Sequence, residues 1–201
     1  MRHVALFFIL VAFAAEGMAQ EETLFKFAGE TSGFGGPVIK LTSVHGQSAL
    51  MIGGRGGWII DHRLVLGGGA YGVVNEIDAP PEALPFEGPL DIEFGYLGFE
   101  VEYILQPMNM VHLSLYTLLG GGATNFVKDV GPVSRSNQQA GETAFMFVIE
   151  PAVNAEMNVT AWFRLNAGLS YRLTFGAEQA GLNDSDFCGM TATLTFKFGT
   201  F

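Results

Sequence analysis

The chain has 201 residues, a formal net charge of −10 and 49 % hydrophobic residues, which suits one domain. Eighteen phenylalanines with only 15 % charged residues argue against intrinsic disorder. Ten Lys and Arg against twenty Asp and Glu exclude a nucleic-acid binder, which needs a basic surface. The single cysteine, Cys188, excludes an intramolecular disulfide framework, and no Cys/His motif indicates a metal site or a cofactor.

The first nineteen residues have the features of a cleaved signal peptide. Arg2 and His3 precede an apolar run of twelve residues, 4–15, and small residues lead to an expected cut before Gln20. A helix of twelve residues spans only ~18 Å of a ~30 Å hydrocarbon core, which disfavours the alternative of a transmembrane anchor. We therefore expect export of the mature chain, in which residues 20–32 form an N-terminal periplasmic segment or lengthen the first strand.

Beyond residue 15 the hydrophobicity comes in short segments with a period of two. No run approaches eighteen apolar residues, which argues against a membrane-spanning helix. In residues 162–175, Leu165 and Leu169 share one face, while Arg164 and Arg172 share the other. A strand separates two such faces and a helix does not. Strands are expected in chain order at 33–44, 50–60, 64–75, 92–103, 111–119, 145–154, 162–175 and 190–198.

The fourth of these segments changes phase. Ile92 and Phe94 stand out of step with Leu97 and Phe99, which follow them. An extra residue in one strand shifts the alternation of the two faces by one position, so we expect a β-bulge between residues 95 and 98.

The connections between these segments alternate in length. Residues 61–63, 105–110 and 157–161 are short, whereas 76–91, 124–142 and 176–186 are long, and only 45–48 breaks the rule. Short turns at one end and long loops at the other are typical of membrane barrels, with turns in the periplasm and loops outside the cell. The sequence therefore predicts an all-β fold, an eight-stranded antiparallel up-and-down transmembrane β-barrel over residues 33–201, with ten strands as the alternative count.

The bulky apolar face is expected to point outward. The interior of an eight-stranded barrel is narrow, and lipid requires an apolar exterior. Unpaired charges inside would be costly, so we expect a network of salt bridges that plugs the lumen, with the selectivity network of a narrow channel as the alternative. The residues expected in this network are Arg55, Glu100, Glu102, His112, Glu150, Arg164, Arg172 and Lys197.

Aromatic residues lie beside the short connections. Trp58, Tyr103, Trp162 and Phe163 are placed where membrane barrels carry an aromatic girdle at the interface. The alternative is ordinary strand composition.

The signal peptide, the eight alternating strands and the terminal run FKFGTF together resemble small outer-membrane β-barrel proteins of the OmpA/OmpX type. The resemblance implies a location in the outer membrane of a Gram-negative bacterium and contact with the lipid bilayer. It also implies that Phe201 is a C-terminal signal for the barrel-assembly machinery. Because Phe201 is out of phase with Phe196 and Phe198, either the last three residues turn away or the strand shifts register there.

One pair of residues has catalytic potential. His112-x-Ser114 resembles the His-x-Ser pair of outer-membrane lipid A deacylases, and two residues along a strand lie ~6.6 Å apart. The alternation places both in the lumen, whereas a site that acts on lipid should open to the membrane. The sequence therefore favours a protein that is not an enzyme.

The long connections are strongly acidic. They contain only two basic residues, Lys128 and Arg135, and their field attracts cations. We expect a structural or surface-interaction role, with cations or an extracellular partner at these loops or, alternatively, a merely solvated rim. The open alternatives are a narrow passive channel, a lipid A-modifying enzyme and a soluble lipocalin-like carrier whose phenylalanine-rich face points inward. The acidic residues are Glu76, Asp78, Glu82, Glu87, Asp91, Asp129, Glu142, Glu178, Asp184 and Asp186.

Overall fold

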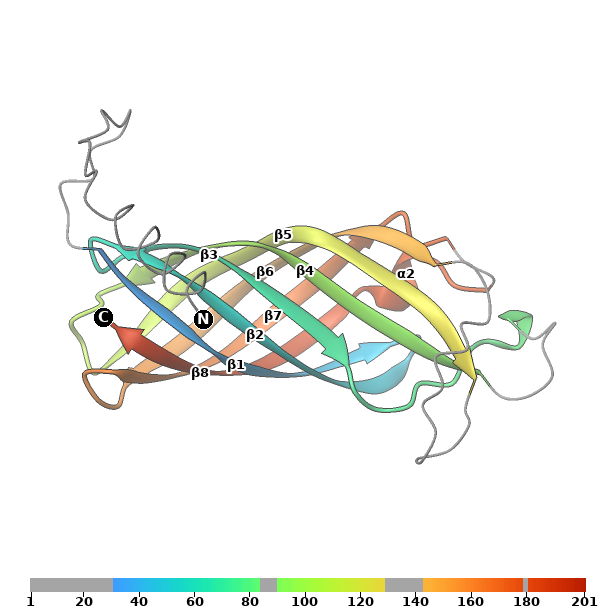
Figure 1. Ribbon diagram of the computed structural model, residues 1–201, viewed down its shortest axis with the longest axis horizontal. Coiled ribbons are helices and arrows are strands. Elements are labelled where there is room, and N and C mark those ends of the chain that lie inside the picture. Colours follow the sequence, from blue (N-terminus) through green and yellow to red (C-terminus); the bar gives the residue numbers. More distant parts are fainter. Residues whose placement is uncertain (1–30, 84–89, 129–142, 179–180) are drawn as a thin grey trace, which may run out of the picture.

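The computed structural model describes residues 31–83, 90–128, 143–178 and 181–201, and its strands form one closed antiparallel barrel (Figure 1). This confirms the predicted fold class and the eight strands. The signal peptide and residues 20–30 lie outside the described residues. No helix in the described part is long and apolar enough to cross a membrane. The strands are β1 (Thr31–Val44), β2 (Gln47–Ile60), β3 (Leu64–Val73), β4 (Leu90–Leu105), β5 (Val111–Lys128), β6 (Ala144–Asn158), β7 (Phe163–Phe175) and β8 (Gly189–Thr200), and the short helices are η1 (Pro81–Ala83) and α2 (Asp184–Phe187).

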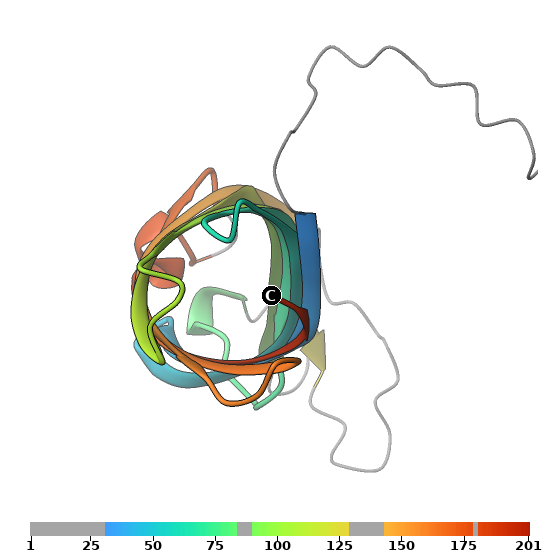
Figure 2. The ribbon, with the colours of Figure 1, turned by 90° about the vertical axis from the view of Figure 1, so that its left-hand side faces the viewer.

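Each strand pairs with its neighbours in the chain, and β8 pairs with β1 to close the ring that Figure 2 shows end-on. Closure gives every strand two partners, so the sheet has no free edge. β1 begins at Thr31, two residues before the expected start of the barrel.

The barrel has two different ends. At one end β1 begins and β8 ends, and this end carries the short connections 61–63, 106–110 and 159–162. We call it the terminal end. The loop end carries the longer connections 74–89, 129–143 and 176–188. It also carries the β1–β2 turn, where His45 (φ 48°) and Gly46 (φ 73°) are both left-handed, as a two-residue type I′ turn requires. The predicted alternation of short and long connections is confirmed, including its exception.

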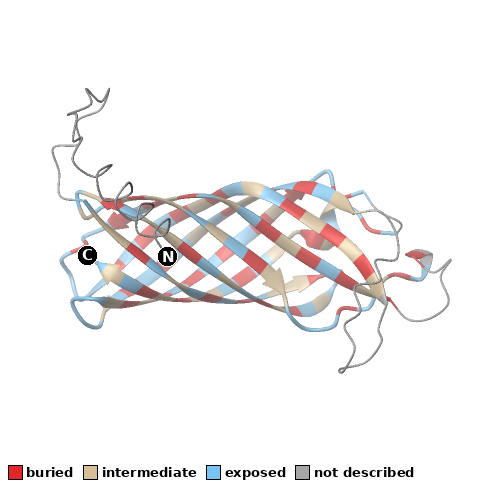
Figure 3. Ribbon diagram, viewed as in Figure 1, coloured by how far each residue is buried: buried red, intermediate tan, exposed pale blue. Residues whose placement is uncertain are grey.

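Buried and exposed residues alternate along the strands (Figure 3). Large apolar side chains such as Leu97, Leu115 and Leu169 are exposed on the outer wall. The side chains between them point into the barrel and are buried. The predicted outward orientation of the bulky apolar face is therefore confirmed.

The predicted bulge in β4 is wrong. β4 pairs with β5 in one unbroken register, from Leu90 opposite Lys128 to Leu105 opposite Leu113. Phe94 is buried on the same inner face as the charged Glu100. Inward and outward positions alternate without interruption along β4. Toward the loop end the apolar residues change from the outer face to the inner face, because the interior of the barrel becomes apolar there.

Candidate functional site

All eight residues expected in the lumen are buried inside the barrel. Two further charged residues lie there, Lys40 and Glu156. Sequence reasoning missed Lys40 because polar and apolar residues alternate only weakly along β1. The alternation is clear only locally, in residues 38–41. Glu156 was missed because β6 continues to Asn158, beyond the expected end at residue 154.

Glu156 is the centre of the ion pairs nearest the terminal end. Its carboxylate lies 3.1 Å from Nη1 of Arg164, 2.5 Å from Nζ of Lys197 and 3.3 Å from Nε2 of His112. The amide of Asn166 donates a fourth contact at 3.2 Å. These residues come from β5, β6, β7 and β8, so the carboxylate links half of the barrel wall.

Glu102 continues the network across the lumen and is fully buried. It accepts from Nζ of Lys197 at 3.0 Å, from Nη2 of Arg55 at 3.0 Å and from Oγ of Ser114 at 2.5 Å. Lys197 therefore bridges Glu102 and Glu156. A buried carboxylate with this many donors is compensated for the loss of its hydration.

Glu100 extends the same chain toward the middle of the barrel. Nε of Arg55 donates to it at 2.8 Å. The hydroxyls of Tyr71 and Tyr116 donate to its other oxygen at 2.6 and 2.7 Å. The guanidinium of Arg55 also lies over the Tyr116 ring, 4.5 Å from its centre.

Glu150 forms a second group. Nζ of Lys40 lies 2.9 Å from its carboxylate, and the hydroxyls of Tyr96 and Ser170 donate to it at 2.5 and 2.6 Å. Lys40 also lies 3.7 Å from the centre of the Tyr71 ring, which connects this group to that of Glu100. We call the two groups together the charged belt: Lys40, Arg55, Glu100, Glu102, Glu150, Glu156, Arg164 and Lys197.

Arg172 is the predicted lumen residue that stands apart from the belt. Its Nε donates to the carbonyl of Phe187 at 2.6 Å, and its Nη2 donates to the carbonyl of Ser43 at 2.9 Å. Its guanidinium lies over the Phe94 ring. Arg172 therefore fastens a connection to the wall at the loop end instead of joining the ion pairs.

Little space is left within the belt. The cavity between Lys40, Arg55 and Glu150 measures about 10 Å³, room for about one water molecule at most. Thr195 and Asn166 also line it. Their Oγ1 and Oδ1 atoms make no hydrogen bond within the part of the chain that the structure describes.

Apolar side chains lie inside the barrel on both sides of the belt. At the terminal end Phe201 packs on a cluster that contains Phe34, and Arg164 lies 4.1 Å from the centre of its ring. The register of β8 is constant to Thr200, so Phe201 follows the inward phase and no shift of register occurs. At the loop end lies a larger cluster, the loop-end core, whose members include Met51, Ile77, Ile92, Phe94, Leu118, Phe126, Met146, Val148, Leu182 and Phe187.

The His112-x-Ser114 pair is buried in the lumen, as expected from the alternation. The Ser114 hydroxyl donates to Glu102 and accepts from Nδ2 of Asn154 at 3.3 Å. The imidazole contacts Glu156 instead. The two side chains thus contact different carboxylates, and neither lies on the outer wall.

The four aromatic residues of the expected girdle all lie near the terminal end. Trp58, Tyr103 and Trp162 are exposed on the outer wall, and Phe163 is half-buried. Trp162 and Phe163 both pack against the ring of Phe198, with centres 6.1 and 5.0 Å away.

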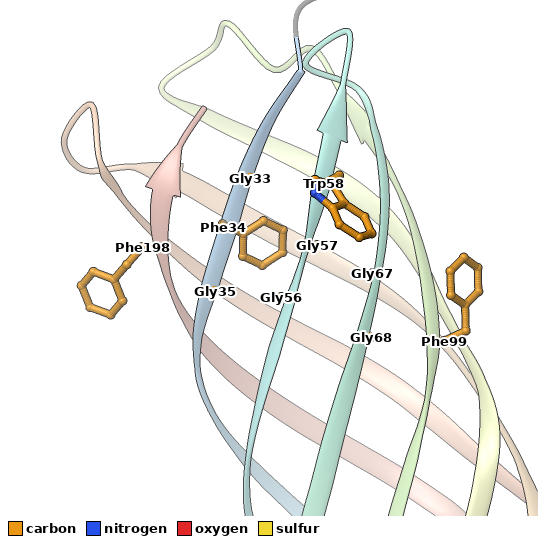
Figure 4. Close-up of a pocket in the computed structure, with 10 residues that line it drawn as sticks. All are labelled: Gly33, Phe34, Gly35, Gly56, Gly57, Trp58, Gly67, Gly68, Phe99 and Phe198. Atoms are coloured by element: carbon orange, nitrogen blue, oxygen red, sulfur yellow. The ribbon is translucent and has the colours of Figure 1, made fainter. Parts of the chain in front are cut away.

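The outer wall near these residues has a hollow of about 690 Å³ (Figure 4). Half of the residues that line it form one row across five strands, in which Gly35, Gly56 and Gly68 are successive register partners. Phe198 and Phe99 are the next partners on either side of the three glycines. The hollow exists because the middle of this row has no side chains.

The acidic loops are only partly described. Glu87, Asp129, Glu142 and the side chain of Glu82 lie outside the described residues. Asp184 and Asp186 accept backbone hydrogen bonds at 2.7 and 2.8 Å from their own connection. Within the described ranges no group of three or more His, Cys, Asp or Glu side chains is arranged to hold a metal ion.

Solved structures share this architecture. Neisserial surface protein A (NspA) is 14 % identical with a TM-score of 0.52, and the match covers 85 % of this chain and 96 % of that one. The N-terminal barrel domain of Pseudomonas aeruginosa OprF is 13 % identical (TM-score 0.49, covering 85 % and 98 %), and Ail, the attachment invasion locus protein of Yersinia pestis, is 14 % identical (0.46, covering 86 % and 97 %). No known family profile and no curated protein matches the sequence. The chain has the fold of small eight-stranded outer-membrane barrels.

Proposed function

We propose that the chain is a transmembrane barrel of the bacterial outer membrane. The observation that carries the proposal is the outer wall, where exposed leucine, phenylalanine and tryptophan side chains surround a sheet without edges. Soluble monomers rarely expose so large an apolar surface, whereas a bilayer requires both features. Export through the signal peptide 1–19, assembly through Phe201 and an interfacial girdle of Trp58, Tyr103, Trp162 and Phe163 complete the proposal.

Within that membrane we infer a structural or surface-interaction role with a plugged lumen. Three observations support it: the belt residues contact one another, the cavity among them is about 10 Å³, and an apolar cluster lies on either side of the belt. The chemistry that remains accessible is then that of the loop end, where the acidic connections would meet cations or an extracellular partner.

Cell fractionation followed by gel electrophoresis with and without boiling tests the membrane proposal. We expect the protein in the outer-membrane fraction, with a clear shift of mobility on boiling because a closed barrel resists detergent. Recovery from the soluble periplasm without detergent and no shift on boiling would contradict it and favour a lipocalin-like carrier.

A narrow channel is the second candidate, because the interior holds five fixed cations and only four carboxylates among the described residues. Conductance in planar bilayers tests it. We expect no unitary conductance for the plugged barrel. A steady conductance that changes in Arg55→Gln or Glu102→Gln would show that ions pass the belt.

The buried His112-x-Ser114 pair supports a protein that is not an enzyme. Mass spectra of lipid A from cells that express the wild type and Ser114→Ala should be identical. A modification of lipid A that disappears only in Ser114→Ala would contradict this part of the proposal.

A further inference from the structure

The helix α2 lies at the loop end of the barrel, at the wall beside β7 and β1 (Figure 1). Its last residue, Phe187, is 0 % exposed and packs against Phe94 of β4, with ring centres 4.9 Å apart. The Phe187 carbonyl accepts from Arg172. The connection between β7 and β8 therefore turns inward and inserts an aromatic ring into the loop-end core.

Helix α2 depends on its neighbours for its position. It has four residues, too few to be stable alone, although Asn183 caps its start. Thr174 donates to the carbonyl of Asp184 at 2.7 Å from β7. On the opposite side it is held by the β1–β2 turn.

His45 makes that second attachment. Its backbone N–H donates to the carbonyl of Asp186 at 2.7 Å, and its Nδ1 lies 2.8 Å from Oδ1 of the same residue. His45 has a φ of 48°, a left-handed conformation that glycine or asparagine adopts at lower cost. The imidazole contact with Asp186 supplies a reason for a histidine at this position.

We propose that α2 with Phe187 is a pH-sensitive cap on the loop-end core, and that the His45–Asp186 pair is its latch. Histidine side chains change charge between about pH 5 and pH 8. A protonated imidazole 2.8 Å from a carboxylate makes a charge-assisted hydrogen bond, whereas a neutral imidazole makes only an ordinary one. The cap therefore closes most tightly in mildly acidic medium and loosens as the pH rises.

The other charged groups around the latch do not reverse this direction of the pH dependence. Arg172 donates to the carbonyls of Ser43 and Phe187, and the carboxylate of Asp184 accepts from the N–H of Ala177. Asp78, from the β3–β4 connection, exchanges backbone contacts with Gln47. β8 packs beside the turn with neutral residues, through Thr191 and Thr42.

Hydrogen exchange measured by mass spectrometry tests the cap on the full chain in detergent, at pH 5.5 and pH 8 and corrected for intrinsic rates. We expect amides in the peptide that covers 181–188 to exchange about two- to fivefold faster at pH 8, since a partly exposed ion pair contributes modestly. His45→Asn keeps a residue suited to the left-handed turn and should exchange fast at both pH values. Asp186→Asn keeps one acceptor oxygen in place of the two that contact His45 and the N–H of Asn183, and it should also abolish the pH dependence.

The matched control is His62→Asn. His62 also has a left-handed φ of 57°, but it lies in the β2–β3 turn at the terminal end. This variant should retain the pH dependence of the wild type. Equal exchange of the wild type at both pH values, or a pH dependence that survives in His45→Asn, would overturn the proposal. A boiling shift in each variant shows that the barrel itself is folded.

Discussion

The two halves of the barrel interior are built from the same eight strands and have opposite chemistry. The half toward the terminal end holds most of the charged belt, whereas the half toward the loop end is an apolar core. In β4 the change occurs between Tyr96 and Glu100, without a break in register. An inward position is therefore polar or apolar according to what the opposite strands and connections place beside it.

Each half is stabilised by what the chain can bring to it. Around the belt the wall strands alone supply both signs of charge, so each carboxylate finds several donors. At the loop end two connections reach inward, and Ile77 and Phe187 are both 0 % exposed. Apolar inward residues there bury these connections as an ordinary hydrophobic core does.

Glu102→Gln should have the largest effect, because it breaks the belt where two cations converge. Arg55 and Lys197 would remain buried without their shared carboxylate, which lowers the free energy of unfolding by about 3–5 kcal/mol. Urea unfolding in lipid vesicles, followed by tryptophan fluorescence, measures it. Glu93→Gln, exposed on the same strand, is the control and should change stability by no more than about 0.5 kcal/mol. Equal effects of the two variants would contradict the importance of the belt.

The stability of the loop-end core should be lowered by cavities instead of by the loss of charges. Leu118→Ala removes a fully buried side chain and should lower the free energy of unfolding by about 3 kcal/mol. Leu119→Ala, the next residue, truncates an exposed side chain on the outer wall and leaves no buried cavity. It should cost less than half as much in the same urea titration. A larger loss for Leu119→Ala would show that the inside and the outside are assigned wrongly.

The boundary between the halves depends on close approach of the backbones. Gly120 pairs with Gly98, and a Cβ on Gly120 would overlap the carbonyl oxygen of Leu97. Gly120→Ala should therefore lower the free energy of unfolding by about 1–3 kcal/mol. Gly72→Ala has open space around its Cβ and should be nearly neutral. Thermal loss of the boiling-sensitive gel band compares the two, and equal midpoints would refute the steric argument.

The smallest effect is expected at Thr195, inside the belt. Its hydroxyl has no partner among the described residues, so Thr195→Val removes no bond that these residues make. The free energy of unfolding should stay within about 0.5 kcal/mol of the wild type or rise. A loss above 1 kcal/mol in the urea titration would show that this hydroxyl is bonded in solution.

Local alternation was sufficient to predict the barrel, its strand count, the outward apolar face and eight buried polar positions. A strand has a period of two wherever it lies, so Arg164 and Arg172 could be assigned to the lumen from β7 alone. The sequence by itself also separated the short turns from the long connections.

Only the tertiary structure decided which inward residues meet. Lys40 and Glu150 are far apart in the chain, and their 2.9 Å contact depends on closure of the sheet. The change of hydrophobic phase in β4 wrongly predicts a bulge because alternation reports only the polarity of each face. Whether an apolar residue lies on the exposed outer wall or in a buried core depends on the connections that fold over it, and here α2 inserts Phe187 beside Phe94.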